Sequence, residues 1–538
     1  MVRRFNVPIP LRDGVVLSAD LTLPGTARAP AVVMRTPYGR SGERQSRIGA
    51  MFAKAGYALV LADVRGRGDS GGEFQPYRND GRDGADVIAW AAAQDWCTGD
   101  VATYGASYSG RVQWLTALER PPALRAMVCI VTPSDPFVEA PTGLPTPMHV
   151  NWQRLTDGRM PQYVDNVDWM AVYRHRPLAT MDEAAGFVSP NWREELRHAT
   201  LDDWWEPVRY QHRMGEIDVP VLHISGWYDD EEIGTPANFA RMVAAGRSGQ
   251  RLLMGPWGHA VNTARVLGGV DFGPQALIDL DGYVAGFLDE HVRKAPAEPH
   301  AAARIFVMGA NEWRDADAWP PLDAPSTVLH LSSTGRANSR FGDGRLVPAP
   351  VTAEEPPDEW THDPDRPVPF ITDASSAQIG GPDDYQGVET RGDVLVFTGD
   401  PLTEPLELIG AVQVTAHVAT SAADTDITAK LLDVHPGGFA QRLCDGMVRL
   451  RYRDGFDRVR PVTPDEVYEV TIPMWDTCVR VPAGHRLRVE IASSAFPKYD
   501  VNLGTGGDMV TETEGVLARN RLWHTPARPS RLTVNDVN

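Results

Sequence analysis

Between about residue 14 and residue 135, short apolar runs alternate with stretches of helical period. Residues 31–35, 57–63, 101–104 and 125–131 are the runs that predict strands. Their nearly continuous apolar character is typical of strands covered on both faces. The stretches between them, such as 43–55, predict helices without internal proline. This alternation predicts a mostly parallel, doubly wound sheet.

The alternation stops at about residue 136 and resumes after residue 215. The interval has no strand pattern and is rich in tryptophan and proline, which predicts an inserted, mainly helical cap. Residues 219–225 and 251–255 then restore the strand pattern. The prediction is one α/β core made of residues 1–135 and 216–295, with the cap, residues 136–215, inserted between these two segments.

From about residue 296 the chain consists of many short strand patterns separated by Gly, Pro and Asp turns. Residues 487–491, for example, alternate with period two. Many short strands with regular turns predict a β-sandwich, of the jelly-roll type, for residues 296–538.

Charge and composition narrow the range of partners. The chain has 52 Lys and Arg against 71 Asp and Glu, a net charge of −19. Binding to nucleic acid or to anionic lipid needs a surplus of cations, so we expect neither partner. The apolar runs are far shorter than the roughly 18 residues that span a bilayer. We therefore expect a cytoplasmic protein. Exposed faces of the predicted jelly roll would also allow two copies of the chain to form a homodimer.

Four cysteines in 538 residues are too few for a disulfide framework. We expect Cys97, Cys129, Cys444 and Cys478 to be thiols, although Cys444 and Cys478 lie in separate predicted strands and could face each other. The chain has no CxxC or HExxH spacing, so the sequence gives no support for a structural zinc site, and we expect no metal.

A strand that runs into a turn of small residues and then into a helix is the setting of a nucleophilic serine. Residues 101–110 read Val-Ala-Thr-Tyr-Gly-Ala-Ser-Tyr-Ser-Gly, and a helical stretch follows. The helix N-terminus behind Ser107 would stabilise developing negative charge. Gly110 stands three positions after Ser107 instead of two. An ordinary strand–helix turn is the alternative interpretation.

The partners of such a serine follow later in the chain. In an α/β-hydrolase the order is Ser, Asp, His, with the acid and the histidine in loops that follow later strands. Asp229 follows the predicted strand at 219–225, and His259 follows the one at 251–255. The serine needs a base, and the imidazole needs a carboxylate. We predict a Ser107–His259–Asp229 triad; His223 is a rival base, but it lies inside its strand.

Several motifs together resemble the cocaine esterase / X-Pro dipeptidyl-peptidase family of serine hydrolases. They are Arg-Thr-Pro-Tyr at 35–38, Asp-Val-Arg-Gly-Arg-Gly-Asp-Ser-Gly-Gly at 63–72, the elbow at 105–110, Trp-Tyr-Asp at 227–229, Gly-Pro-Trp-Gly-His at 255–259, and the segments 425–427, 431–434 and 496–507.

This resemblance implies an α/β-hydrolase core, a cap and a C-terminal jelly roll. It also implies an oxyanion hole made by the Tyr38 hydroxyl and the Tyr108 backbone amide, and an acyl-enzyme that needs no metal or organic cofactor. Without the resemblance, Tyr38 could be a packed tyrosine beside a proline turn.

Four consecutive acids begin at the predicted catalytic aspartate, Asp229-Asp230-Glu231-Glu232. The chain is similar here to α-amino acid ester hydrolases, in which acids two and three positions after that aspartate hold the substrate ammonium. The resemblance assigns this role to Glu231 and Glu232, with Glu139 or Asp135 as a third acid. A solvated acidic helix start is the alternative.

We therefore expect a small-molecule ester or amide with an amine-bearing acyl group: an α-amino acid ester, a small peptide or an amino-β-lactam. Trp152 and Trp169 of the cap could line the acyl pocket. The alternatives are a general carboxylesterase for neutral esters, an acyltransferase that keeps water from the acyl-enzyme, and an inactive binding protein.

Overall fold

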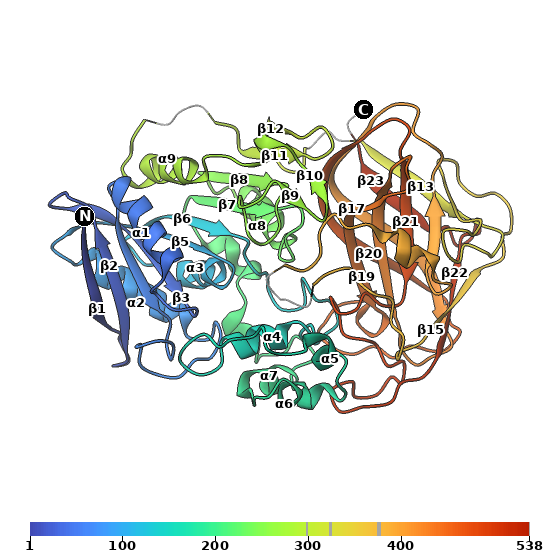
Figure 1. Ribbon diagram of the computed structural model, residues 1–538, viewed down its shortest axis with the longest axis horizontal. Coiled ribbons are helices and arrows are strands. Elements are labelled where there is room, and N and C mark those ends of the chain that lie inside the picture. Colours follow the sequence, from blue (N-terminus) through green and yellow to red (C-terminus); the bar gives the residue numbers. More distant parts are fainter. Residues whose placement is uncertain (297–299, 322–324, 374–377, 537–538) are drawn as a thin grey trace.

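The computed structural model of the protein describes residues 1–296, 300–321, 325–373 and 378–536. Figure 1 shows two sheet-containing regions side by side, with the N-terminal part of the chain on the left and the C-terminal part on the right. A group of short helices from the middle of the chain, α4 to α7, lies below the junction between the two regions.

The first region is built on a mixed sheet whose ten described strands run in the order β1-β2-β4-β3-β5-β6-β7-β8-β11-β12. All neighbouring pairs from β4 to β11 are parallel, and the outer pairs are antiparallel. The bounds are β1 Val2–Pro10, β2 Val16–Leu23, β3 Ala29–Thr36, β4 Ala58–Asp63, β5 Cys97–Ala106, β6 Leu124–Ile130, β7 Val221–Gly226, β8 Gln250–Gly255, β11 Ala303–Val307 and β12 Glu312–Ala316.

Helices cover both faces of this sheet, which is why inner strands such as β3, β4 and β7 are buried along their whole length. Along β3, Ala31 and Val33 pack with α2 and α3, whereas Val32 and Met34 pack with α1 and α9. The helix bounds are α1 Glu43–Lys54, α2 Asp80–Ala92, α3 Tyr108–Leu118, α8 Gly234–Ala244 and α9 Leu280–Val292. The predicted α/β-hydrolase fold class is confirmed. The sheet, however, continues through β11 and β12 and so extends beyond residue 295, where its predicted domain ends.

The cap consists of short helices joined by irregular segments and 3₁₀ turns. Its own apolar cluster includes Met148, Trp169 and Trp192, and it also contains Phe496 and Met509 from the C-terminal region. The cap is therefore packed against the C-terminal region as well as placed over the sheet. Its helices are α4 His149–Leu155, α5 Trp169–Tyr173, α6 Met181–Ala184 and α7 Pro190–Glu195.

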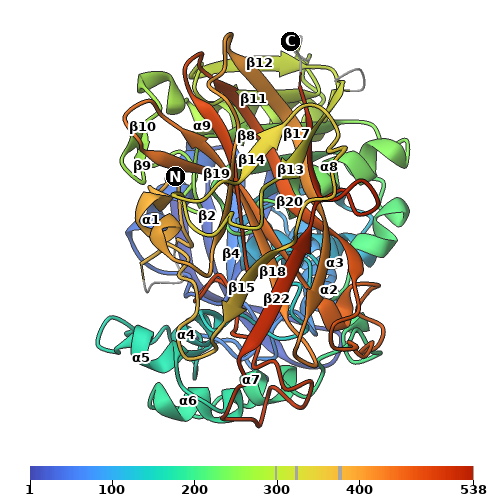
Figure 2. The same cartoon turned by 90° about the vertical axis from the view of Figure 1, so that its right-hand side faces the viewer.

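The second region is a β-sandwich, as the sequence predicts. Its eleven described strands pair in the order β15-β22-β17-β23-β13-β14-β16-β21-β18-β19, with β20 on β17. Figure 2 views this region with β15 and β22 toward the reader. The strands are β13 Ser326–Ser332, β14 Arg345–Val347, β15 Asp358–His362, β16 Leu395–Thr398, β17 Leu406–Thr420, β18 Asp426–Val434, β19 Ala440–Arg449, β20 Tyr468–Val481, β21 Arg486–Ala492, β22 Ala518–Trp523 and β23 Arg531–Asn535.

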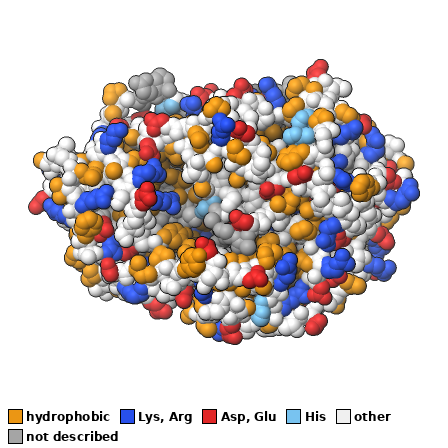
Figure 3. Space-filling view, viewed as in Figure 1, with side chains coloured by type: hydrophobic (Ala, Val, Ile, Leu, Met, Phe, Trp, Pro, Cys, Tyr) orange, Lys and Arg blue, Asp and Glu red, His pale blue; other side chains and the backbone are white. Residues whose placement is uncertain are grey.

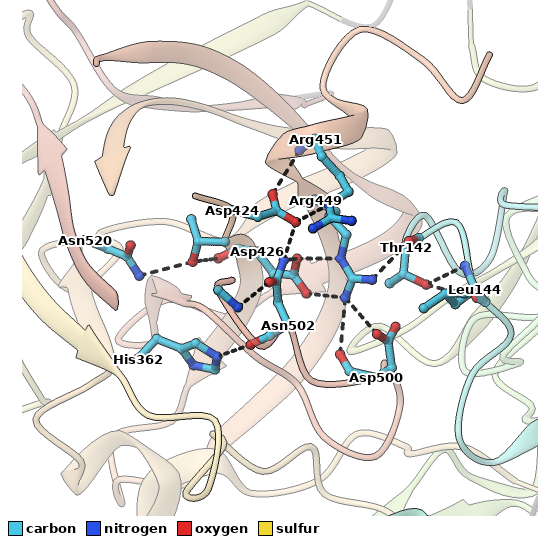
Figure 4. A network of polar contacts seen from close by, with 12 residues as sticks. Thr142, Leu144, His362, Asp424, Asp426, Arg449, Arg451, Asp500, Asn502 and Asn520 are labelled. Atoms are coloured by element: carbon cyan, nitrogen blue, oxygen red, sulfur yellow. Dashed lines mark hydrogen bonds and ion pairs between the residues drawn. The ribbon is translucent and has the colours of Figure 1, made fainter. Parts of the chain in front are cut away.

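A buried ionic network joins the sandwich to the start of the cap (Figure 4). The guanidinium of Arg449, which is fully buried, donates to both carboxylate oxygens of Asp426 at 2.8 Å and to Asp500 at 3.0 Å. It also donates to the carbonyl oxygen of Thr142 at 3.0 Å. Because Thr142 lies in the segment that enters the cap, the sandwich holds that segment in place.

All four cysteines are buried free thiols. Of the helices in the described part of the chain, none combines the length and the apolar character that crossing a lipid bilayer requires.

Candidate active site

Ser107 occupies the sharp turn between β5 and α3. Its backbone lies at φ 57° and ψ −127°, which residues other than glycine rarely adopt. Tight packing explains the two glycines of the motif. A Cβ at residue 105 would lie 2.5 Å from the Cβ of Ser109, and one at Gly110 would lie 2.5 Å from the Thr132 hydroxyl. The glycine three positions after the serine therefore meets the requirement of an elbow.

His259 and Asp229 meet at the carboxyl ends of β8 and β7. The Nδ1 atom of His259 lies 2.8 Å from Asp229 Oδ1, and the Ser225 hydroxyl donates to Asp229 Oδ2 at 2.7 Å. With the Nδ1 proton shared with a buried carboxylate, Nε2 is the nitrogen left for proton transfer. His259 and Ser107 line the same cavity.

The Gln378 side chain, from the C-terminal region, holds this loop. Its Oε1 atom accepts the backbone N–H of His259 at 2.9 Å, and its Nε2 donates to the carbonyl oxygen of Tyr228 at 2.9 Å. A Cβ at Gly258 would clash with the same side chain. The sequence prediction missed Gln378, because no local pattern connects it to a loop 119 residues earlier.

Tyr38 lines the same cavity as Ser107. Its hydroxyl accepts a hydrogen bond from Trp152 Nε1 at 2.9 Å. Burial raises the pKa of Tyr38 to about 12, so the hydroxyl keeps its proton at neutral pH and can donate. Tyr108 is the first residue of α3, and its buried side chain donates to Asp80 at 2.5 Å. That bond anchors the N-terminus of α3, where the backbone N–H of Tyr108 directly follows Ser107.

The acidic run is not a solvated helix start, because α8 begins only at Gly234. Asp229 and Glu232 are buried, and Asp230 and Glu231 are partly buried. Asp230 and Glu231 line the cavity with His259, whereas Glu232 does not. Glu232 lies in a small void beside Asp476 and Lys498. This differs from the prediction, which placed both glutamates at the substrate. Consecutive side chains of a turn point in different directions, and only one of this pair faces the cavity.

Glu139, one of the two residues predicted as a third acid, also lines the cavity. It accepts the backbone N–H of Ser134 at 2.6 Å, and burial raises its pKa to about 7. Asp135, the other predicted possibility, instead accepts the N–H of Tyr210 at 2.8 Å and lies outside the cavity lining. Among the acids considered, those that share the cavity are Asp230, Glu231 and Glu139.

The charges of these acids shift the pKa values of the other acids and of His259. Burial, with neighbouring negative charges, raises the pKa of Glu231 well above its usual range. Burial would lower the pKa of His259, but its hydrogen bond with Asp229 and the charges of Asp230 and Glu231 outweigh that effect and raise the pKa to about 10. The acidic groups around the imidazole therefore favour a bound proton or cation at this site.

The cavity has a volume of about 1070 Å³, enough for a small substrate with its leaving group. Figure 3 shows a hollow near the middle of this face of the molecule. Trp152 lines the cavity, but Trp169 packs in the cap core, with Nε1 donating to Val164 at 2.8 Å. Aromatic and cationic lining residues that the sequence prediction did not select are Tyr77, Arg111, Trp204, Trp205 and Lys498.

Two groups of three His and Asp side chains in the described ranges have ligand atoms within 4.8 Å of one another, as a metal ion would need. One is Asp229, Asp230 and His259, in which the histidine Nδ1 already shares its proton with Asp229. The other lies in the β-sandwich.

Comparison with known proteins identifies two family models along the chain. Residues 13–261 match the X-Pro dipeptidyl-peptidase (S15 family) model, and residues 297–533 match the X-Pro dipeptidyl-peptidase C-terminal non-catalytic domain. Cocaine esterase from Rhodococcus sp. (strain MB1 Bresler) is 33% identical over 570 aligned residues, which cover 98% of this chain and 97% of that protein.

Two solved structures have the same fold along the whole chain. One is an aminopeptidase from a marine sediment archaeon, Thaumarchaeota archaeon, with a TM-score of 0.89 and 25% identity. The other is an α-amino acid ester hydrolase, with a TM-score of 0.88 and 26% identity. In both cases the match covers 100% of this chain and 96% of the other.

Proposed function

This chain belongs to the S15 family of X-Pro dipeptidyl-peptidase and cocaine esterase-like serine hydrolases, and on that premise we propose that Ser107, His259 and Asp229 are its catalytic triad. The geometry that supports the assignment is the strained turn at Ser107 and the 2.8 Å contact between His259 and Asp229. Its substrate is a small ester or amide.

In the proposed reaction, the Ser107 hydroxyl attacks the carbonyl carbon while His259 Nε2 takes its proton. The tetrahedral oxyanion accepts hydrogen bonds from the Tyr38 hydroxyl and the Tyr108 N–H. His259 then protonates the leaving group, which departs and leaves an acyl group on Ser107. Water, activated by the same imidazole, releases the acid and restores the serine.

The acyl group of the proposed substrate carries an amine. The observation that carries this proposal is the Glu231 carboxylate, which lines the cavity with its Oε2 atom buried and without a hydrogen-bond partner. Asp230 and Glu139 share the cavity wall with it. Buried acids of this kind are stabilised by a cation or a proton, and a substrate ammonium supplies that cation.

The same charge has a consequence for the base. The acids around His259 raise its pKa to about 10, which favours the protonated imidazole in the free enzyme. An ammonium beside Asp230 and Glu231 offsets their charge, so its binding lowers the pKa of His259 and frees the imidazole to accept the serine proton. A neutral ester does not have this effect. An amine-bearing substrate is therefore favoured in binding and in catalysis.

The names of the structural relatives agree with this substrate class, since one is an α-amino acid ester hydrolase and the other an aminopeptidase. Cocaine esterase is the relative that favours the second candidate, a carboxylesterase that does not need an amine on the acyl group.

The test compares kcat/KM for an amino acid ester with that for its N-acetylated and deamino analogues. A charge pair 4 Å apart is worth about 4 kcal/mol at an effective dielectric constant of 20, and desolvation cancels part of it. We expect a preference of roughly hundredfold for the free amine, which corresponds to about 2.7 kcal/mol. Glu231→Gln should remove most of that preference.

Glu195→Gln is the matched control, because Glu195 lines the same cavity but is already paired with His149 at 3.2 Å. Its preference for the free amine should equal that of the parent. Equal turnover of neutral and amine-bearing esters by parent and Glu231→Gln would instead identify a general carboxylesterase.

Two further measurements separate the remaining alternatives. Ser107→Ala should lose ester turnover while it folds normally, and the parent should react with a fluorophosphonate probe; an inactive binding protein would not be labelled. Adding an amine acceptor and following aminolysis against hydrolysis distinguishes an acyltransferase from a hydrolase.

A further inference from the structure

Two histidines and an aspartate are brought together at one end of the β-sandwich, on adjacent strands. Asp433 and His435 are two residues apart at the end of β18, so they project to the same face. Strand β21 pairs antiparallel with β18, with Val434 opposite Arg486. Continuing that register by one residue places His435 opposite His485, where cross-strand side chains lie close together.

The three side chains are already near the spacing of metal ligands. His485 Nδ1 lies 2.8 Å from Asp433 Oδ1, and His435 Nε2 lies 3.7 Å from Asp433 Oδ2. The two imidazole rings are 4.4 Å apart between centroids. Around a tetrahedral zinc ion with bonds of about 2.0–2.1 Å, neighbouring ligand atoms are about 3.4 Å apart. Small side-chain rotations would bring all three atoms to that separation.

We propose that Asp433, His435 and His485 form a binding site for a divalent late transition-metal ion, with zinc as the best match. Two imidazole nitrogens and one carboxylate oxygen are a ligand set that suits Zn²⁺ and does not suit Ca²⁺ or Mg²⁺. The ion takes the place of the proton between His485 and Asp433. It also requires the lone pair of His435 Nε2, with the proton of that ring on Nδ1.

The surroundings provide an entry path and a fourth ligand. The side chains of His435 and His485 are 35% and 15% exposed, whereas that of Asp433 is 7% exposed. The ion would thus be reached from solvent and held against a buried carboxylate. The Oε1 atom of Gln441 lies 3.3 Å from His435 Nε2 and accepts a hydrogen bond when that nitrogen carries the ring proton. When the ring proton is on Nδ1, the same oxygen can complete the coordination in place of water.

Such an ion would join two separate turns. His435 begins the turn between β18 and β19, in which its N–H donates to Phe439 at 2.9 Å, and His485 immediately precedes β21. Gln441 also donates to the hydroxyl of Tyr228 at 3.3 Å, and Tyr228 directly precedes Asp229 in the chain. Metal binding should therefore stabilise the sandwich where it meets the hydrolase core. The site does not depend on the proposed substrate or triad.

The experiment uses the full chain, freed of metal with a chelator and then titrated with ZnCl₂ by calorimetry. We expect one zinc ion per chain that is lost, or bound at least tenfold more weakly, in His435→Gln and His485→Gln. The parent should also unfold at a higher temperature with zinc than without it. His330→Gln, a change of one histidine in β13 of the same region, is the matched control and should bind zinc as the parent does.

Asp433→Asn separates loss of zinc binding from loss of folding. Asparagine can still accept the hydrogen bond from His485, but it lacks the negative charge that binds the metal ion. The variant should fold and lose the zinc. Zinc bound at Asp229, Asp230 and His259 would be recognised separately, as inhibition of ester hydrolysis that His435→Gln does not relieve. An absence of zinc binding by the parent, or equal binding by all three ligand variants, would show that Asp433 and His485 are an ordinary structural pair.

Discussion

Replacing Tyr38 with phenylalanine removes a single hydroxyl from the wall beside Ser107. That hydroxyl accepts the Trp152 indole N–H at 2.9 Å, and it lines the cavity together with Ser107. Because its pKa is raised to about 12, it is a neutral donor throughout the pH range of ester hydrolysis. The phenylalanine ring fits the same space, so the change isolates the hydroxyl.

The expected loss is large because the hydroxyl acts where charge develops. Removal of one oxyanion donor from an enclosed site costs roughly 2.7–4 kcal/mol, or a factor of about 10²–10³ in kcat. The hydroxyl is one of only two proposed donors, so we expect Tyr38→Phe to fall in this range. KM should change little, since the interaction strengthens in the transition state. Trp152 loses its acceptor, which lowers the free energy of unfolding by about 1–3 kcal/mol.

The assay is stopped-flow hydrolysis of a nitrophenyl ester, in which the burst reports acylation and the steady state reports turnover. Both steps pass through an oxyanion, so both should slow. Tyr104→Phe is the control, because Tyr104 lines the same cavity from β5 and should retain activity within about twofold. A folded Tyr38→Phe variant that keeps kcat within threefold of the parent would refute the oxyanion role.

Three further predictions concern the base, its loop and the cap. In Glu231→Gln, loss of a negative charge lowers the pKa of His259; because the imidazole acts when it is neutral, the acidic limb of the kcat/KM profile for a neutral ester should move to lower pH. Gln378→Ala should reduce kcat about tenfold with little change in KM, as it removes the hydrogen bond that holds the His259 loop and is worth about 1–1.5 kcal/mol. Arg449→Leu leaves Asp426 and Asp500 buried without their cation, so guanidinium titration should show a free energy of unfolding lower by about 3–5 kcal/mol; an unchanged midpoint would contradict that network.

Much of the fold, and the position of each residue of the proposed triad at the end of a strand, is encoded locally. Inner strands of the core such as β4 and β6 are mostly apolar because helices cover both faces of the sheet, and this leaves a clear pattern in the chain. The elbow at Ser107 is also local, since a strained turn between a strand and a helix requires small neighbours within a few residues. Asp229 and His259 were predictable because parallel strands bring the loops at their carboxyl ends to one edge of the sheet.

The charge arrangement of the cavity was decided by tertiary structure. Glu231 and Glu232 are adjacent and chemically equivalent in the sequence, yet only Glu231 faces the cavity. Which of two neighbouring side chains does so depends on how the turn packs against the β-sandwich. For the same reason Glu139 lines the cavity while Asp135 is bound to a backbone amide.

Contacts between distant segments could not be predicted from the sequence either. Gln378 reaches the His259 loop, and Arg449 holds Thr142 at the entrance to the cap. Periodicity and turn chemistry report interactions between residues that are near one another in sequence. A hydrogen bond between segments a hundred or more residues apart depends on the packing of whole domains, and no local pattern determines it.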